Sequence, residues 1–192
     1  MTPLFANLRA DAPRYYFGPP PLRPVTALRA VWTQPGFQAL AVYRLGRWLK
    51  ACLRRPPCWP ALLLGPLFWL LQAWIRLAYD INLDLSADLG AGLYIGHLGG
   101  IVVSNCRLGS HCAIQQEVRI HADRGASGAP GPVVGDRVWI GAHARVVGPL
   151  HVGDQATVGA GAVVEADVAP RCLVLGEPAR TVRWDFDNSE FL

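Results

Sequence analysis

An aliphatic residue returns at nearly every sixth position from Leu89 to Val164, and a glycine or another small residue usually follows it. A period of six fits neither an α-helix, which repeats about every 3.6 residues, nor a single long strand, which alternates every two. It is typical of a solenoid in which each hexad forms one short side of a coil and successive coils stack. We expect the aliphatic side chain to point inward and the small residue to help the backbone turn the corner.

Two breaks in the repeat are informative. Ile101 and Leu108 are seven residues apart, which indicates one extra residue near Arg107. Ile120 and Val134 are fourteen apart, which is one hexad plus an excursion of eight residues. The excursion lies in a Gly-, Ala- and Pro-rich segment, HADRGASGAPGP, so we expect a loop that leaves the coil. Such loops on rigid scaffolds often carry binding chemistry.

Residues 1–80 are predicted to be mainly helical, with a helix over Pro35–Lys50. The apolar segment Trp59–Tyr79 has about the length of a membrane span, but two prolines, a glutamine and an arginine interrupt it. Three interpretations stay open for this segment. It is a helix packed in the protein or its oligomer, a peripheral membrane contact with tryptophans at the interface, or a true span.

Composition narrows the class of protein. The net charge is +4 and the arginines are scattered, so a nucleic-acid partner is not expected. The five cysteines form no CxxC pair, which favours free thiols in a reducing compartment and no metal site. The first residues lack the apolar stretch of a secretory signal. We therefore expect a cytoplasmic protein, associated with the inner face of the membrane if 59–79 contacts lipid.

His97 differs from the other four histidines because glycines surround it. In the segment YIGHLGGIVV, Gly96, Gly99 and Gly100 leave space for a ligand or a neighbouring subunit to approach closely. A neutral imidazole in such a place can take a proton from an attacking hydroxyl. The alternative is a histidine that only fills a gap in an interface.

Three segments resemble one known family. PGFQALAVYRLGRWL is similar to the family's KGFHALQAYRIGHWLW, and GHLGGIVV is similar to DHATGIVV, whose histidine is the catalytic base. IGAHARVVGPLHVGDQATVGAGAVV, followed by GEPAR, resembles the family's last coils and its closing G-x-PAR. Over residues 30–182 the chain thus resembles the hexapeptide-repeat acyltransferases, in particular the serine acetyltransferases and their polysaccharide-acetylating relatives.

The resemblance implies a mainly β fold: a left-handed parallel β-helix with an α-helical N-terminal region. It also implies assembly as a homotrimer and acetyl-CoA as the acetyl donor. The expected organisation is a helical region at 1–80, an acetyltransferase β-helix at 81–182 and a loose, acidic tail at 183–192.

Roles carry over from the family residue by residue. His97 matches the general base, which deprotonates an acceptor hydroxyl that attacks the thioester directly. The small residues that match the family's backbone sites for the CoA arm are Gly141, Ala142, Gly159 and Ala160. Arg180, in the closing motif, is a candidate cation for the CoA phosphates.

The chain departs from the serine acetyltransferase pattern beside the base. The Asp that orients the base stands fifteen residues before it, and counting back from His97 gives Asn82. Asp80 or Asp84 can replace it only if the strand register differs from the family's. The Asp directly before the base is Gly96 here.

A second departure lies at the end of the long loop. The family's Arg-His-Pro, where Arg and a second His help to hold serine, reads Pro130-Gly131-Pro132. Serine carries a carboxylate and an ammonium group, and both need charged or polar partners. Arg124 and His121, in and beside the same loop, are candidate replacements.

These observations favour an acetyl-CoA-dependent O-acetyltransferase that acts on a hydroxyl other than that of free serine. The expected acceptor is a sugar of an exopolysaccharide or lipopolysaccharide precursor, small or lipid-linked, because a neutral acceptor needs no ionic clamp. The first alternative is the serine O-acetyltransferase of cysteine biosynthesis. A non-catalytic solenoid that binds partners is a further alternative, and a gamma-type carbonic anhydrase, which needs three converging histidines, is the weakest.

Overall fold

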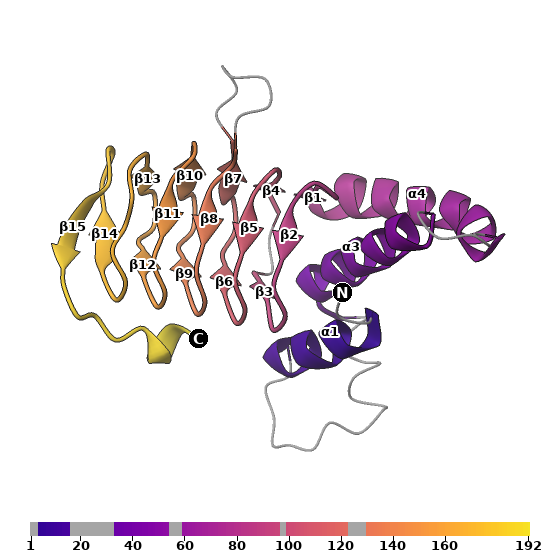
Figure 1. The fold of residues 1–192 in the computed structure, drawn as a ribbon, viewed down its shortest axis with the longest axis horizontal. Coiled ribbons are helices and arrows are strands. Elements are labelled where there is room, and N and C mark those ends of the chain that lie inside the picture. The colour runs from indigo at the N-terminus through magenta and orange to yellow at the C-terminus, as the bar shows by residue number, and fades with distance from the viewer. Residues whose placement is uncertain (1–3, 16–32, 54–58, 97–98, 123–129) are drawn as a thin grey trace.

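The structure is a computed structural model that describes residues 4–15, 33–53, 59–96, 99–122 and 130–192. A helical region and a stack of β-coils lie end to end along the longest axis (Figure 1). The helices are α1 (Leu4–Asp11), η1 (Ala12–Tyr15), α3 (Pro35–Cys52) and α4 (Trp59–Tyr79), and a short η2 (Ser189–Phe191) ends the chain. None of these described helices has the length and hydropathy of a transmembrane span.

In the described residues fifteen short strands form three sheets, and up to β14 each strand along the chain lies in a different sheet from the one before it. The first sheet contains β1 (Ile81–Leu83), β4 (Ile101–Val103), β7 (Arg119–His121), β10 (Arg145–Val147) and β13 (Val163–Val164). The second contains β2 (Asp88–Leu89), β5 (Arg107–Leu108), β8 (Val133–Val134) and β11 (His151–Val152). The third contains β3 (Tyr94–Ile95), β6 (Ala113–Ile114), β9 (Trp139–Ile140), β12 (Thr157–Val158), β14 (Leu173–Leu175) and β15 (Arg180–Arg183).

All pairings between neighbouring coils are parallel, and only β15 runs antiparallel, against β14. Each turn of the chain therefore adds one strand to each sheet, which is the architecture of a three-sided parallel β-helix. The predicted fold class, a parallel β-helix with an α-helical N-terminal region, is confirmed.

The strand registers give the length of each coil. Val133 pairs with His151, so a regular coil has eighteen residues, or three hexads. Arg119 pairs with Arg145 across twenty-six residues, which confirms the excursion of eight. Residues 123–129 of that excursion lie outside the described chain. Asp88 pairs with Arg107 nineteen residues on, so this coil has one extra residue. It does not lie near Arg107, as predicted, because the inward residue Val103, which pairs with Ile120, is only five residues before Leu108.

The aliphatic residue of each hexad points into the coil, as predicted. Ile114, Ile140, Val146 and Val158 have no exposed surface. Burying such a side chain stabilises the fold by about 1.5–3 kcal/mol relative to leaving it exposed. The repeat therefore supplies one continuous core.

The small residue after it has a different task from the one expected. At the corner of residues 135–137, Arg137 and not Gly135 has the left-handed backbone, with φ of 55°. A Cβ on Gly135 would collide with Asp154 Oδ1 of the next coil and lie 2.9 Å from the Asp154 nitrogen. Gly135 is thus required for close stacking of the coils, and the residue two positions later turns the chain.

Replacing Gly135 with alanine is expected to lower the free energy of unfolding by about 1–3 kcal/mol, because the added methyl group meets the backbone of the next coil. Urea unfolding followed by circular dichroism measures this loss. Gly65→Ala is the control, because a Cβ there meets no atom within 4 Å. Equal midpoints for Gly135→Ala and the parent would contradict the stacking role.

The helical region closes the open end of the first coil, which has no preceding coil to pair with. Asp11 accepts hydrogen bonds from the amides of Gly92 and Leu93, at 2.7 and 3.1 Å, and the Tyr15 hydroxyl accepts one from Ile95 at 2.8 Å. On the carbonyl side, Arg44 Nη1 and Nη2 donate to Leu89 and Gly90, each at 2.5 Å, and the Tyr43 hydroxyl donates to Ala87 at 2.7 Å. A solenoid needs such a cap, because its terminal coil otherwise exposes unpaired backbone groups.

Arg44 and Asp11 also form a buried ion pair, with Nε and Oδ2 3.2 Å apart and both side chains nearly inaccessible. Burial raises the pKa of the Asp11 carboxyl, although Arg44 and the backbone amides of Leu93 and Gly92 act in the opposite direction.

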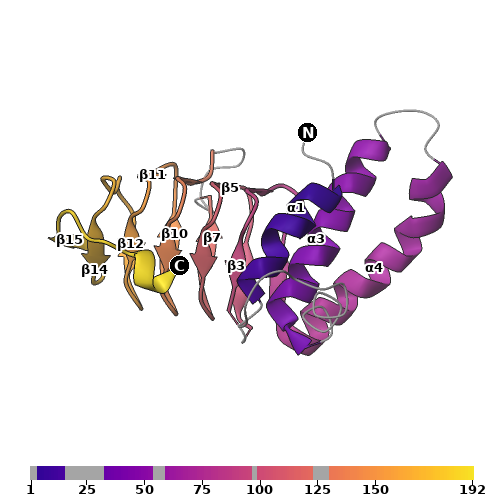
Figure 2. The same cartoon turned by 90° about the horizontal axis from the view of Figure 1, so that it is seen from below.

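The tail at 183–192 is anchored to the solenoid at Asn188 and Phe191, unlike the loose tail that was expected, although most of its side chains are exposed. Asn188 is 3% exposed and donates through Nδ2 to the carbonyl of Arg137 at 2.9 Å. The rings of Phe191 and Trp139 lie 5.2 Å apart. Figure 2 shows the tail turning back along the β-helix. Aromatic and amide contacts outweigh the acidity that suggested a solvated segment.

Candidate functional site

The corner between the third and first sheets carries most of the predicted site residues. We call it the site corner; among the described residues it comprises 96, 99–100, 115–118, 141–144 and 159–162 on successive coils. His97 itself lies outside the described residues, so its role stays a prediction. Its neighbours are placed: Gly96 donates to the carbonyl of Ile114 at 2.7 Å, and Gly100 donates to that of Asp80 at 2.9 Å.

Asp80 is the carboxylate next to this segment. It directly precedes β1, as Gly100 precedes β4, because Ile81 pairs with Ile101. A Cβ built on Gly99 would lie 3.0 Å from the Asp80 Cβ. Asp80 therefore stands beside the segment that contains His97.

Asn82, the residue found by counting back from His97, is engaged elsewhere. Its Oδ1 accepts a hydrogen bond from Arg76 Nη2 at 2.9 Å. The first coil is two residues longer than a regular one, because Leu83 and Val103 pair across twenty residues. Leu83, Leu89 and Ile95 are buried at intervals of six, and Val103, which pairs with Leu83 and Ile120, follows Ile95 after eight, so the extra residues lie between Ile95 and Val103. Asp80 is the candidate carboxylate because it approaches Gly99, and not because of its distance along the chain.

The predicted CoA sites follow on later coils of the same corner. Gly141 donates to the carbonyl of Val158 at 2.8 Å and Gly159 to that of Val174 at 2.9 Å, which fixes the stack. Within the described chain, the amide groups of Ala142 and Ala160 have no hydrogen-bond acceptor.

At the corner between the second and third sheets, the corresponding backbone amides have hydrogen-bond acceptors. There the amides of Ser110 and Asp136 donate to the carboxylates of Asp136 and Asp154, at 2.6 and 2.8 Å. At the site corner, by contrast, the amides of Ala142 and Ala160 have no acceptor among the described residues and stand next to small side chains. An extended ligand with amide carbonyls, such as the pantetheine arm of CoA, fits this pattern.

Arg180 does not belong to the site corner. It lies in β15 at the C-terminal end of the third sheet, where its side chain is exposed and Nη1 donates to the carbonyl of Ala179 at 3.0 Å. Its predicted contact with CoA phosphates stays a prediction.

A contact between an imidazole and a carboxylate that the sequence did not reveal lies on the site corner. His143 Nδ1 and Glu117 Oε2 are 3.1 Å apart, and both side chains are exposed. Glu117 also donates through its amide to the carbonyl of Gly99 at 3.0 Å. The two residues are twenty-six apart in sequence, so only the coil containing the long loop brings them together.

The end of the long loop cannot hold a second histidine. A Cβ on Gly131 would collide with the carbonyl oxygen of Asn105 and lie 2.6 Å from its carbon. His121 is half-buried, and its Nδ1 lies 2.7 Å from the carbonyl of Ala122. Arg124 lies outside the described residues.

The buried cysteines are unsuited to act as nucleophiles. Burial raises the pKa of the Cys106 thiol to about 12 and that of Cys112 to about 11. A thiol attacks as the thiolate, so these two side chains are inert near neutral pH. The four described cysteines are free, as expected.

Comparison with known proteins decides the family. The model of the bacterial transferase hexapeptide, with six repeats, matches residues 131–166. The serine acetyltransferase of Synechococcus elongatus is 32% identical over 180 residues, which cover 93% of this chain and 69% of that protein. The chain belongs to the serine acetyltransferase family. The Escherichia coli K12 serine acetyltransferase is 33% identical over 148 residues, which cover 77% of this chain and 50% of that protein.

Solved structures agree with this assignment. The soybean serine acetyltransferase apoenzyme superposes with a TM-score of 0.76 at 29% identity, over 93% of this chain and 69% of that one. The Neisseria gonorrhoeae serine acetyltransferase in complex with serine superposes with a TM-score of 0.75 at 26% identity, over 94% of this chain and 69% of that one. The chain thus spans between half and about 70% of the length of these relatives. The predicted class, an acyltransferase with acetyl-CoA as donor, is that of the family and is confirmed.

Proposed function

We propose that this chain transfers the acetyl group of acetyl-CoA to the hydroxyl of L-serine. The observation that carries the proposal is the site corner, where the amides of Ala142 and Ala160, without an acceptor among the described residues, lie on the second and third coils beyond Gly96 and Asp80. The sugar acceptor that the sequence favoured has no support in the comparisons. Serine, the alternative, fits the relatives better.

In the proposed reaction, neutral His97 takes the proton of the acceptor hydroxyl as its oxygen attacks the thioester carbon. The tetrahedral intermediate then expels the CoA thiolate, and the imidazolium returns the proton to sulfur. The acetyl–oxygen bond replaces the acetyl–sulfur bond, and no acyl-enzyme forms. General-base assistance of this kind contributes about 100- to 10,000-fold to the rate.

Asp80 is the proposed positioning residue for His97. A carboxylate that accepts a hydrogen bond from imidazole fixes the tautomer and stabilises the imidazolium that forms during attack. This assignment rests on the register of Ile81 with Ile101 and on the approach of Asp80 to Gly99.

Replacing Asp80 with asparagine is expected to lower kcat by roughly tenfold or more, because the imidazolium loses its anionic partner. The acid limb of the pH–rate profile should move to lower pH, since protonated imidazole is then less favoured. Asp84→Asn is the matched control, as Asp84 is also exposed in the first coil. Equal losses in both variants, or an unmoved profile, would remove Asp80 from this role.

A neutral hydroxyl, such as that of a sugar, is the second candidate acceptor. The collision of any side chain at position 131 with Asn105 favours it, because the family's second histidine cannot stand there. Pro130 and Pro132 provide no charge for the carboxylate of serine.

The acceptor is tested by measuring CoA release with a thiol reagent in the presence of L-serine, or of a neutral hexose at the same concentration. The proposal expects saturable, serine-dependent release and O-acetylserine in the mass spectrum. Release with the hexose alone would establish the second candidate instead. No release with either acceptor, together with no binding of acetyl-CoA, would support a non-catalytic solenoid.

Assembly as a homotrimer is part of the proposal, with the cleft for CoA between adjoining solenoids. Light scattering after gel filtration should give about three times the chain mass of 20.8 kDa. A monomeric yet active protein would contradict it. The expected cytoplasmic location stays a prediction.

A further inference from the structure

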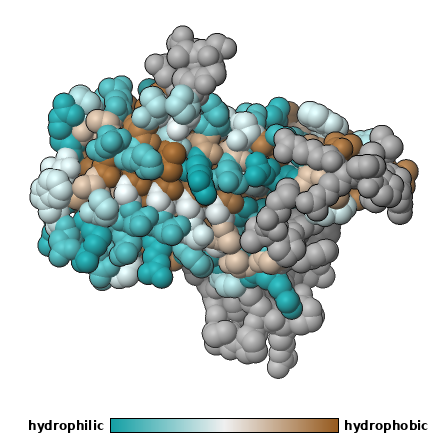
Figure 3. Space-filling view, viewed as in Figure 1, coloured by the Kyte–Doolittle hydropathy of each residue, from teal (hydrophilic) through white to brown (hydrophobic). Residues whose placement is uncertain are grey.

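Helix α4 carries a broad apolar face that no described part of the chain covers. A narrow stripe of the helix, including Phe68 and Ile75, is buried in the core shared with α3 and the first coil. Six large apolar side chains are exposed instead: Leu63, Leu67, Trp69, Leu70, Trp74 and Leu77. They are six of the eleven large exposed apolar side chains in the described residues, so exposed apolar surface is concentrated here. Apolar residues show at this helical end of the molecule in Figure 3.

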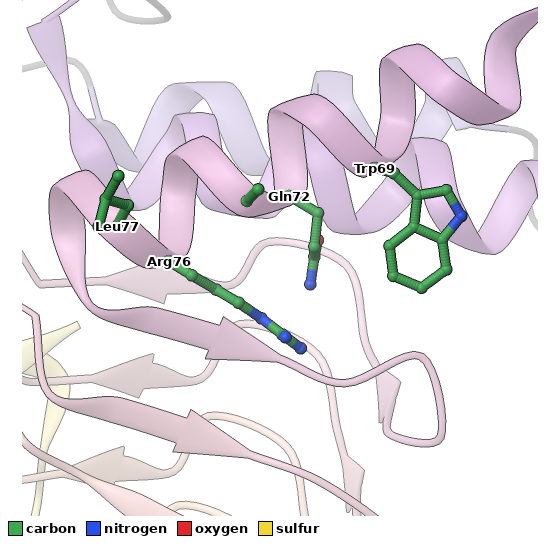
Figure 4. A pocket seen from close by; sticks show the side chains of 5 residues that line it. Trp69, Gln72, Arg76 and Leu77 are labelled. Atoms are coloured by element: carbon green, nitrogen blue, oxygen red, sulfur yellow. The ribbon is translucent and has the colours of Figure 1, made fainter.

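The width of this face argues against a single partner helix. At about 100° per residue, the six side chains and the alanines and proline between them cover about half of the helix circumference. No charged residue lies in that arc. Gln72 and Arg76 stand at one side, where they line a pocket with Trp69, Ala73 and Leu77 (Figure 4). A two-helix seam uses a narrower stripe bordered by charges.

Charge is distributed unevenly between the two parts of the chain. Residues 1–79 contain ten of the eighteen Lys and Arg residues and one of the fourteen Asp and Glu residues, Asp11, which pairs with Arg44. Residues 80–192 contain eight basic and thirteen acidic residues and are therefore negative, although the whole chain is +4. The apolar face thus belongs to a strongly basic part of the molecule.

We propose that the exposed face of α4 binds an anionic lipid surface, with the helix lying in the plane of the interface. Apolar side chains enter the headgroup boundary, tryptophans favour that depth, and basic residues are attracted to anionic lipids. The helix lies flat because its opposite stripe, with Phe68 and Ile75, stays packed on the protein. Docking onto the same face of a second copy would bring two strongly basic regions together, which is unfavourable.

Such binding would hold the site corner close to the membrane. Helix α4 ends at Tyr79, directly before Asp80, and a Cβ on Gly99 would collide with the carbonyl oxygen of Tyr79. This inference goes beyond the proposed function and does not depend on which hydroxyl is acetylated.

Sedimentation with vesicles tests the proposal. The full chain is mixed with vesicles of phosphatidylcholine alone, or with about a quarter of phosphatidylglycerol. We expect binding to the anionic vesicles that weakens as salt rises, since screening shortens the range of the attraction. Trp69→Glu should reduce the partition coefficient at least about tenfold, because a large apolar contact is lost and a negative charge is gained.

Trp184→Glu is the matched control, because Trp184 and Trp69 are both 68% exposed but Trp184 lies in the tail of the solenoid. It should change vesicle binding by less than about twofold. Circular dichroism and acetyl transfer to a soluble acceptor check that both variants fold, and they separate this test from that of the proposed function. No vesicle binding by the parent, or equal losses in both variants, would overturn the proposal. The proposal would also be overturned if the parent protein formed a larger assembly than the Trp69→Glu variant and did not bind vesicles. A second copy of the chain would then cover the face.

Discussion

Replacing His97 with alanine is expected to lower kcat by at least about 100-fold, while the Kd for CoA and the mass of the assembly stay nearly unchanged. The proposed base removes the acceptor proton only during attack, so its loss affects the transition state and not the binding of donor. The flanking Gly96 and Gly99 keep the backbone of this segment in contact with neighbouring coils, independently of the imidazole. Steady-state kinetics measures kcat, and isothermal titration calorimetry with CoA measures the Kd.

The control is His111→Ala. His111 is an exposed corner histidine that lies between the second and third sheets, near Gly92 and away from the site corner. It should leave kcat within about twofold of the parent value. A His97→Ala variant with unchanged turnover would remove His97 from the role of base.

Replacing Arg44 with alanine should cost about 3–5 kcal/mol of unfolding free energy, because it leaves the buried Asp11 carboxylate without its cation. The carbonyls of Leu89 and Gly90 lose their donors in the same step. At about 2–4 °C per kcal/mol for a chain of this size, Tm falls by roughly 6–20 °C. Thermal unfolding followed by circular dichroism measures it.

The unfolding free energy lost in the Arg44→Ala variant should be smaller at pH 5 than at pH 8. Burial already raises the pKa of Asp11, and removing Arg44 raises it further. A carboxyl with a folded pKa above its unfolded value loses stability as pH rises, because the unfolded chain releases the proton first. At lower pH the buried carboxyl stays neutral and the cost falls.

Arg47→Ala is the control for Arg44. Arg47 pairs with Asp88 at 2.9 Å on the surface, so its loss should cost less than about 1 kcal/mol. Similar destabilisation by the two variants, or a loss for Arg44→Ala that does not depend on pH, would contradict the capping role of the buried pair.

The coils could be predicted from sequence because an inward aliphatic residue is required at each side of the prism. Ile114, Ile140 and Val158 mark this pattern directly, and coil lengths follow from their spacing. The role of Gly135 could not be predicted, because it depends on how close the next coil approaches. The anchoring of the tail could not be predicted, because Asn188 bonds to residues far away in sequence.

The candidate site was predicted in part. Small residues at 141–142 and 159–160 identified one corner, and the structure brings them together. The sequence leaves Asp80 as a conditional substitute for Asn82, because only the structure shows which of the two side chains approaches Gly99. The pair of Glu117 and His143 forms only after an excursion of eight residues leaves the coil.

The most direct test of the account is a crystal structure with CoA bound. The account predicts that the amides of Ala142 and Ala160 donate to the pantetheine arm and that the CoA sulfur lies within about 4 Å of the His97 ring, which Asp80 contacts from its other side. A CoA molecule bound away from this corner, or a His97 ring turned into the core of the coil, would contradict it.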